Sequence, residues 1–227
     1  MQSGGKRVLI VLTSHDQLGD TGTKVGWYLP EAAHPYNAFK AGGCTISWAS
    51  PKGGEAPVDP ASLDMNDAGN KSFWENEETQ NMTKNTMKLS DCKSEDYDCI
   101  FFAGGFGVMW DFPDDPDVHR LCKEMYEAGK IVSAVCHGPA ALLKVKLSNG
   151  EYMVKGHDIA AFTNEEEDAM ERRKIVPFTC EDLLKENGGF HKSAGVFKPC
   201  VAVSGLLYTG QNPPSAGPLA EEIVKKL

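Results

Sequence analysis

Residues 130–143 read KIVSAVCHGPAALL, a run in which an apolar strand turns sharply into a helix at Cys136. A turn of this kind strains the residue at its apex and crowds the positions two before and two after it, which therefore need small side chains. Ala134 and Gly138 stand at those positions, and Pro139 suits a first helical turn because its missing N–H would have no partner there. The pattern predicts a nucleophile elbow, with the thiol beside a helix N-terminus that favours thiolate. The plainer alternative is a core cysteine at the end of a strand.

Segments on both sides of this run alternate between buried strands and helices. Strands are expected at 8–12, 44–49, 97–103, 130–135, 157–163, 199–204 and 206–209, and helices at 26–40, 117–128, 138–146, 180–187 and 215–226. This alternation predicts a flavodoxin-like α/β sandwich, a mostly parallel sheet covered by helices on both faces with functional groups at the carboxyl ends of its strands. Residues 50–71 are turn-rich, and a polar helix-like segment follows at 72–89. We therefore expect a single domain over residues 1–227 with a small cap insertion at about 51–95.

Composition and charge exclude several classes of function. The 227 residues suffice for one well-buried core but not for two generous domains. Lys and Arg number 23 against 32 for Asp and Glu, a net charge of −9, so neither nucleic acid nor an anionic membrane is an expected electrostatic partner. The early apolar run at 8–12 is too short for a signal peptide or a membrane span, and we expect a cytoplasmic protein.

The seven cysteines form no CxxC pair and no Cys/His ligand spacing. The sequence therefore indicates neither a metal site nor a disulfide framework, and in a reducing compartment the thiols stay free. Their odd number raises the question whether one of them is a working thiol.

The other parts of a thiol-based active site are sought at neighbouring strand ends. The N–H of His137 is one candidate oxyanion donor, and the glycine-rich loop at 104–107 offers a second. His137 is also the candidate base. Acidic residues at 165–168 follow a strand, although a solvated helix N-terminus explains acids there equally well. Glu31 lies in an apolar, aromatic segment, so it is either a buried carboxyl beside the thiol or a surface residue.

Four separated motifs, AVCHGPAALL, FFAGGFG, GWYLPEAAHPY and AFTNEEE, together resemble the ThiJ/PfpI superfamily with its class I glutamine amidotransferase-like fold. The pattern is most similar to the branch of glutathione-independent glyoxalase III enzymes and heat-shock chaperones. The resemblance implies conversion of methylglyoxal to lactate through a cysteine hemithioacetal, without cofactor or metal, as protection against reactive dicarbonyls. It implies a small dicarbonyl as substrate, and we also expect a homodimer.

Family roles are carried over position by position. The nucleophile falls on Cys136, the histidine on His137, the early buried glutamate on Glu31 and the glycine oxyanion donor on Gly105. The triad acid of this branch stands four residues after the Thr of a Phe-Thr pair, which is Glu167 here. Three consecutive glutamates make Glu166 an alternative. Where the branch often has a histidine this chain has Phe106, which removes a polar substrate contact at that position.

Rival functions are weighed on the same residues. A glutaminase-type amidotransferase is disfavoured because none of the six histidines has Glu two residues later. In a cysteine peptidase, the expected cap would obstruct an extended peptide. A holdase chaperone would need an exposed apolar patch, a deglycase would remove methylglyoxal adducts from protein or nucleobases, and an accessible thiolate would suit an oxidative-stress sensor. These last three remain alternatives.

Overall fold

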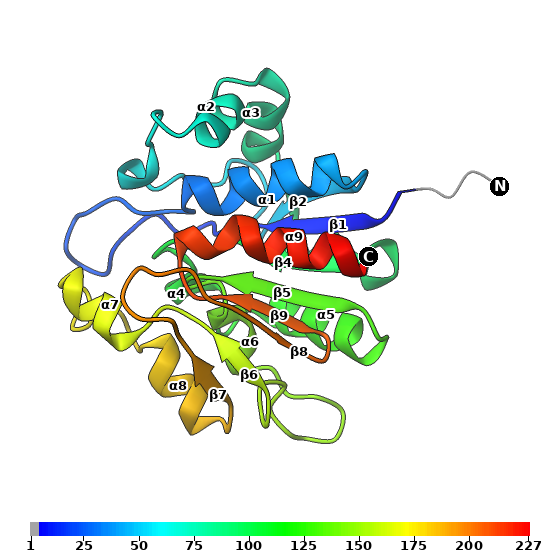
Figure 1. Cartoon of the computed structure of the whole chain (residues 1–227), viewed down its shortest axis with the longest axis vertical. Coiled ribbons are helices and arrows are strands. Elements are labelled where there is room, and N and C mark those ends of the chain that lie inside the picture. Colours follow the sequence, from blue (N-terminus) through cyan, green and yellow to red (C-terminus); the bar gives the residue numbers. More distant parts are fainter. Residues whose placement is uncertain (1–4) are drawn as a thin grey trace.

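A seven-stranded sheet runs through the protein, which a computed structural model describes over residues 5–227 (Figure 1). The strand order is β3-β2-β1-β4-β5-β9-β8, and every neighbouring pair is parallel except β8 and β9. The strands are β1 (Arg7–Val11), β2 (Thr45–Ser50), β3 (Met87–Lys88), β4 (Cys99–Phe102), β5 (Ile131–Val135), β8 (Val201–Ser204) and β9 (Leu207–Gly210). The arrangement confirms the predicted flavodoxin-like class.

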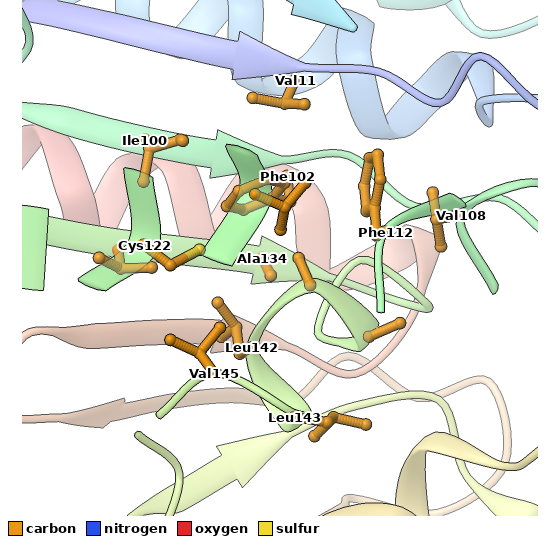
Figure 2. Packing of buried hydrophobic residues seen from close by; sticks show 14 of the residues in the cluster. Val11, Ile100, Phe102, Val108, Phe112, Cys122, Ala134, Leu142, Leu143 and Val145 are labelled. Atoms are coloured by element: carbon orange, nitrogen blue, oxygen red, sulfur yellow. The ribbon is translucent and has the colours of Figure 1, made fainter. Parts of the chain in front are cut away.

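Helices cover both faces of this sheet because its strands are apolar on both sides. Along β1, Val8 and Ile10 join the hydrophobic cluster under α1 (Leu29–Ala41) and α9 (Ala216–Lys226). The alternate residues Leu9 and Val11 join the cluster under α4 (Val108–Asp111), α5 (Pro116–Glu127) and α6 (Ala140–Leu143). Figure 2 shows side chains of this second layer, in which the ring of Phe102 from β4 packs edge-on against that of Phe112, which directly follows α4. Such two-sided burial is what a parallel sheet requires.

The two prolines of the first helix act differently from each other. Pro30 lies in the first turn of α1, so the helix begins at Leu29 rather than at residue 26. Pro35 lies inside α1, which nevertheless continues to Ala41 without interruption. The helix thereby delivers Glu31 from its first turn to the carboxyl end of the sheet.

The segment between β2 and β4 differs from its predicted form. A single helix-like stretch at 72–89 was expected, but the structure has α2 (Ala68–Trp74) and α3 (Glu77–Lys84), separated where Asn76 caps α3 by accepting the N–H of Glu78. Met87 and Lys88 then form β3 and pair with β2 at the sheet edge. Short 3₁₀ turns occur at Pro60–Ser62, Leu89–Asp91 and Ser94–Asp96.

A second, two-stranded sheet lies outside the central one. The strand predicted at 157–163 forms as β6 (Asp158–Ala160) and pairs in parallel with β7 (Phe190–Lys192), outside the central sheet. The sequence analysis missed β7, which is only three residues long and partly polar. Helices α7 (Asn164–Ala169) and α8 (Cys180–Glu186) lie between these two strands in the chain, and a 3₁₀ turn at Pro213–Ser215 precedes α9. Within residues 5–227, no helix is both long enough and apolar enough to cross a membrane.

Candidate active site

The Cys136 thiol lies at a strained turn between β5 and α6. Its φ of 62° places a non-glycine residue in the left-handed region, as expected at the apex of a nucleophile elbow. The crowding is also as predicted: a Cβ on Gly138 would lie 2.4 Å from the carbonyl oxygen of Phe102 and 2.7 Å from that of Val135. The backbone at this position therefore tolerates only glycine without rearrangement.

His137 connects the thiol to a buried carboxylate. Its Nδ1 is 3.4 Å from Cys136 Sγ, and its Nε2 is 2.6 Å from Oε1 of Glu167. Only the tight turn lets these adjacent side chains meet. When Nε2–H donates to the carboxylate, Nδ1 carries the lone pair and can accept the thiol proton. The rings of Phe106 and Phe162 both pack against the imidazole, with centroids 4.6 and 4.4 Å from its own, and these contacts restrict the orientation of the imidazole ring.

The adjacent glutamates of α7 have different partners, although both are fully buried. Glu167 contacts His137, and its second oxygen has no hydrogen-bond partner within residues 5–227. Glu166 instead accepts the N–H of Thr163, completing a capping box. It also accepts hydrogen bonds from Phe197, Gln211 and Asn212. The solvated position that we considered for Glu166 is therefore wrong, whereas Glu165 and Asp168 are exposed.

Glu31 is a buried carboxyl beside the thiol, the first of the two positions that the sequence left open. Its Oε2 accepts the N–H of Gly104 at 2.7 Å. Burial raises the pKa of Glu31 to about 8, against the lowering effects of the Cys136 thiol and the Gly104 N–H. Near neutral pH this carboxyl is therefore largely protonated and can donate a hydrogen bond to sulfur.

The expected lowering of the thiol pKa by a helix N-terminus is wrong for the free protein. Burial, followed by the negative charge of Glu31, raises the pKa of Cys136 well above its ordinary value. The following helix α6 spans only four residues, so its dipole is weak. Near neutral pH the thiol is therefore mostly protonated, and a neighbouring base would have to take up its proton to form a thiolate.

Two backbone N–H groups near the thiol are the candidate oxyanion donors, and that of His137 lies within hydrogen-bonding reach of the Cys136 sulfur. Neither Gly105 nor His137 donates its N–H to an oxygen acceptor within residues 5–227. Gly105 has a φ of 105°, and a Cβ there would lie 2.1 Å from the carbonyl oxygen of Gly26. Glycine is therefore required at the position where the family resemblance places an oxyanion donor.

A cavity of about 380 Å³ opens over these groups. Its lining includes Glu31, Gly105, Cys136 and His137, which the structure thus brings together, and also Tyr28. An apolar wall completes it, formed by Phe106, Phe162, Met170, Phe197, Pro213 and Pro214. None of the described residues that line the cavity is lysine or arginine. In the same part of the chain, no three His, Cys, Asp or Glu side chains cluster as metal ligands would.

Part of this wall could not be predicted from the sequence. Phe162 belongs to the AFTNEEE motif, but that motif served only to locate the acid. Phe197 lies in an irregular stretch with no periodicity, and no signal in the sequence places it near Cys136. Met170 directly follows α7, a segment whose acidic residues were the only candidate site residues predicted there.

The chain is similar to several known proteins over most of its length. The family model described as the DJ-1/PfpI family matches residues 26–226. Glyoxalase 3 of Candida albicans is 31% identical over 228 residues, which cover 96% of this chain and 97% of that protein. The glutathione-independent glyoxalase HSP31 of Saccharomyces cerevisiae is 31% identical over 224 residues, covering 93% of each chain.

Solved structures give the same picture. The rapid encystment protein of 24 kDa from Francisella tularensis superposes with a TM-score of 0.94 at 37% identity, covering 97% of this chain and 98% of that one. Glyoxalase III from Candida albicans superposes with a TM-score of 0.87 at 30% identity, covering 97% and 96%. The similarity extends over nearly the whole chain, and it confirms the resemblance that the sequence motifs indicated.

Proposed function

The chain belongs to the DJ-1/PfpI family, and on that premise we propose that it is a glutathione-independent glyoxalase of the glyoxalase III type that converts methylglyoxal to lactate, a lyase with Cys136 as its nucleophile. Two relatives that are named glyoxalases are 31% identical to this chain, and the alignments cover nearly the full length of each. The observation that carries the proposal is the contact chain from Cys136 through His137 to the buried Glu167, beside a cavity whose described lining has no lysine or arginine.

The reaction begins with the proton of the thiol. His137 Nδ1 accepts that proton, and the thiolate attacks the aldehyde carbon of methylglyoxal. A C–S bond forms, and the carbonyl π electrons move to oxygen. The resulting oxyanion accepts hydrogen bonds from the N–H groups of Gly105 and His137, then takes the proton back to give a hemithioacetal. Protonated Glu31 stabilises the thiolate by a hydrogen bond before attack.

The second half moves hydrogen between adjacent carbons. His137, held by Glu167, removes the proton from the former aldehyde carbon to form an enediolate and returns it to the neighbouring carbon. The hydroxyl proton shifts from the first oxygen to the second, leaving a lactoyl thioester on Cys136. Water attacks this thioester, the C–S bond breaks, and lactate and the thiol are released. Glutathione is not needed because the protein supplies the thiol.

The same environment disfavours the peroxide-sensing alternative. Oxidation-prone cysteines are accessible and have a lowered pKa. Cys136 is only 4% exposed, and burial raises its pKa. A buried thiol that is activated only with substrate and His137 fits covalent catalysis better than sensing.

The test is lactate formation by Cys136→Ser, with Cys200→Ser as the matched control at a half-buried thiol that borders a different hollow. We expect Cys136→Ser to lose at least about a thousandfold in kcat/KM while keeping its fold, because serine is a far weaker nucleophile here. Cys200→Ser should behave like the wild type. Lactate formation by Cys136→Ser without added thiol would contradict the mechanism.

An aggregation-suppression assay on Cys136→Ser separates the chaperone alternative. Full suppression together with loss of lactate formation would show a holdase activity independent of the proposed chemistry.

A further inference from the structure

The segment 193–198, here called the lip, holds an aromatic side chain in a strained backbone conformation beside the cavity. Phe197 has a φ of 53°, a left-handed value that costs a bulky residue free energy. Its side chain lines the cavity, yet the residue is 46% exposed, so burial alone does not explain the conformation. Strain that persists at a ligand cavity points to a function of the strained side chain.

Three fully buried side chains clamp the backbone of the lip. Gln211 accepts the N–H of Ala194 at 2.9 Å and donates to the carbonyl oxygen of Gly195 at 2.8 Å. Asn212 donates to the carbonyl oxygen of Lys198 at 2.8 Å.

Glu166 completes the clamp by accepting the N–H of Phe197 at 2.9 Å. It also accepts from the side chains of Gln211 and Asn212, at 3.0 and 2.8 Å, so the three clamp residues fix one another. Buried, mutually satisfied polar networks of this kind are rigid. The backbone that carries the Phe197 ring is therefore held in place, so the ring is presented to the cavity from a defined position.

The position of that wall bears on the substrate. Phe197 packs near Phe162, with ring centroids 6.4 Å apart, and Phe162 in turn packs on His137. A dicarbonyl bound to Cys136 with its oxyanion at Gly105 has its remaining substituent available to this aromatic wall. The lining offers that substituent apolar surface and no cationic side chain. Uncharged, apolar substituents are favoured in such a site and anionic ones are not.

We propose that Phe197, held by the Glu166–Gln211–Asn212 clamp, is a specificity-determining residue that selects uncharged α-oxoaldehydes by the apolar substituent on their ketone carbon. This inference rests on the proposed glyoxalase function and goes beyond it by naming the side chain that discriminates among such substrates and the substituent that it contacts. Larger substituents gain most from the wall, because the gain grows with the apolar area that is buried.

The experiment compares glyoxal, methylglyoxal and phenylglyoxal, whose substituents are hydrogen, methyl and phenyl. We expect Phe197→Ala to lower kcat/KM for phenylglyoxal about tenfold and for glyoxal less than about twofold, with methylglyoxal in between. Phe197→Leu, which restores apolar bulk, should keep most of the phenylglyoxal activity and also serves if the alanine variant folds poorly. Val196→Ala is the control, because Val196 is an exposed lip residue that does not line the cavity. Equal losses for all three substrates, or no change, would overturn the proposal.

A second readout does not depend on turnover. Phenacyl bromide and bromoacetone each alkylate a thiolate, forming a C–S bond as bromide leaves, and they differ in phenyl against methyl. The alkylation rate at Cys136 is followed by peptide mass spectrometry for each reagent. The rate with phenacyl bromide divided by the rate with bromoacetone should fall several-fold in Phe197→Ala. If the wild type forms no hydroxy acid, the proposed function fails, and an unchanged alkylation ratio separately refutes the role of Phe197.

Discussion

The elbow around Cys136 and the lip around Phe197 face the same cavity and share an unusual backbone. Both residues have left-handed φ values, 62° and 53°, without being glycine. Each is connected to one of two adjacent glutamates of α7: Glu167 through His137 for the elbow, and Glu166 directly for the lip.

The two regions differ in what holds the strain. At the elbow, backbone atoms hold the strained conformation. Strand β5 ends at Val135, and the carbonyl oxygens of Phe102 and Val135 leave no room for a larger residue at Gly138. At the lip, three buried side chains from other parts of the chain do so. Strain in a local turn can be predicted from the neighbouring residues, whereas strain held by a clamp depends on residues distant in sequence and cannot.

The largest expected effect separates the two glutamates. Glu167→Gln should lower kcat for methylglyoxal about a hundredfold to a thousandfold, because a neutral amide no longer stabilises the protonated imidazole or fixes its tautomer. The melting temperature should change little, since the amide keeps the shape. Steady-state kinetics and a thermal melt check both points. Wild-type kinetics in this variant would remove Glu167 from the mechanism.

Glu166→Gln should act on the lip instead. The amide replaces a carboxylate that accepts hydrogen bonds from Thr163, Phe197, Gln211 and Asn212, and its NH₂ group would face donors. We expect a loss of about 2–4 kcal/mol in the free energy of unfolding, measured by denaturant titration, with glyoxal turnover within about fivefold of the wild type. The control is Glu165→Gln at the exposed neighbouring position, which should be neutral. A larger kinetic loss than that of Glu167→Gln would reverse the two assignments.

The smallest effect concerns the pH dependence of the elbow. Because burial raises the pKa of Glu31 to about 8, wild-type kcat/KM should fall as the pH rises through that value, when the ionised carboxylate repels the thiolate. Glu31→Gln cannot ionise, so this alkaline decline should flatten, with activity at lower pH within about tenfold of the wild type.

Stability gives an independent check on Glu31. A raised pKa in the folded state means that its stabilising contribution is complete below the ordinary value of 4.5 and is lost as the pH rises to about 8. The free energy of unfolding of Glu31→Gln should therefore improve relative to the wild type across that range. A parallel pH profile for the two proteins would show that Glu31 has no raised pKa.

Much of the elbow and the sheet could be predicted because the signals are local. Apolar runs predicted β1, β2, β4 and β5 to within two residues at most ends, and the small residues around Cys136 predicted the turn. Short elements were the failures: β7 has three residues, and the break between α2 and α3 depends on a single capping residue, Asn76. Such elements are stabilised by tertiary contacts rather than by periodic patterns.

The site divides in the same way. The family spacing placed the triad acid on Glu167, but three consecutive glutamates left Glu166 open, since the direction of each side chain depends on how α7 packs in the folded chain. The structure turns Glu167 toward His137 and Glu166 toward the lip. The raised pKa of Cys136 was likewise out of reach, because burial and the distance to Glu31 are properties of the fold.

The amino-acid sequence by itself determined the parallel α/β sandwich, the thiol at a strand-to-helix turn, and the small residues that this turn needs, because each follows from steric limits within a few neighbouring residues. Only the tertiary structure decided which glutamate orients His137, that Glu31 is buried and largely protonated, and that Phe197 forms a wall of the cavity. Those features depend on contacts between residues far apart in the chain, whose distances and burial are set when helices and loops pack together.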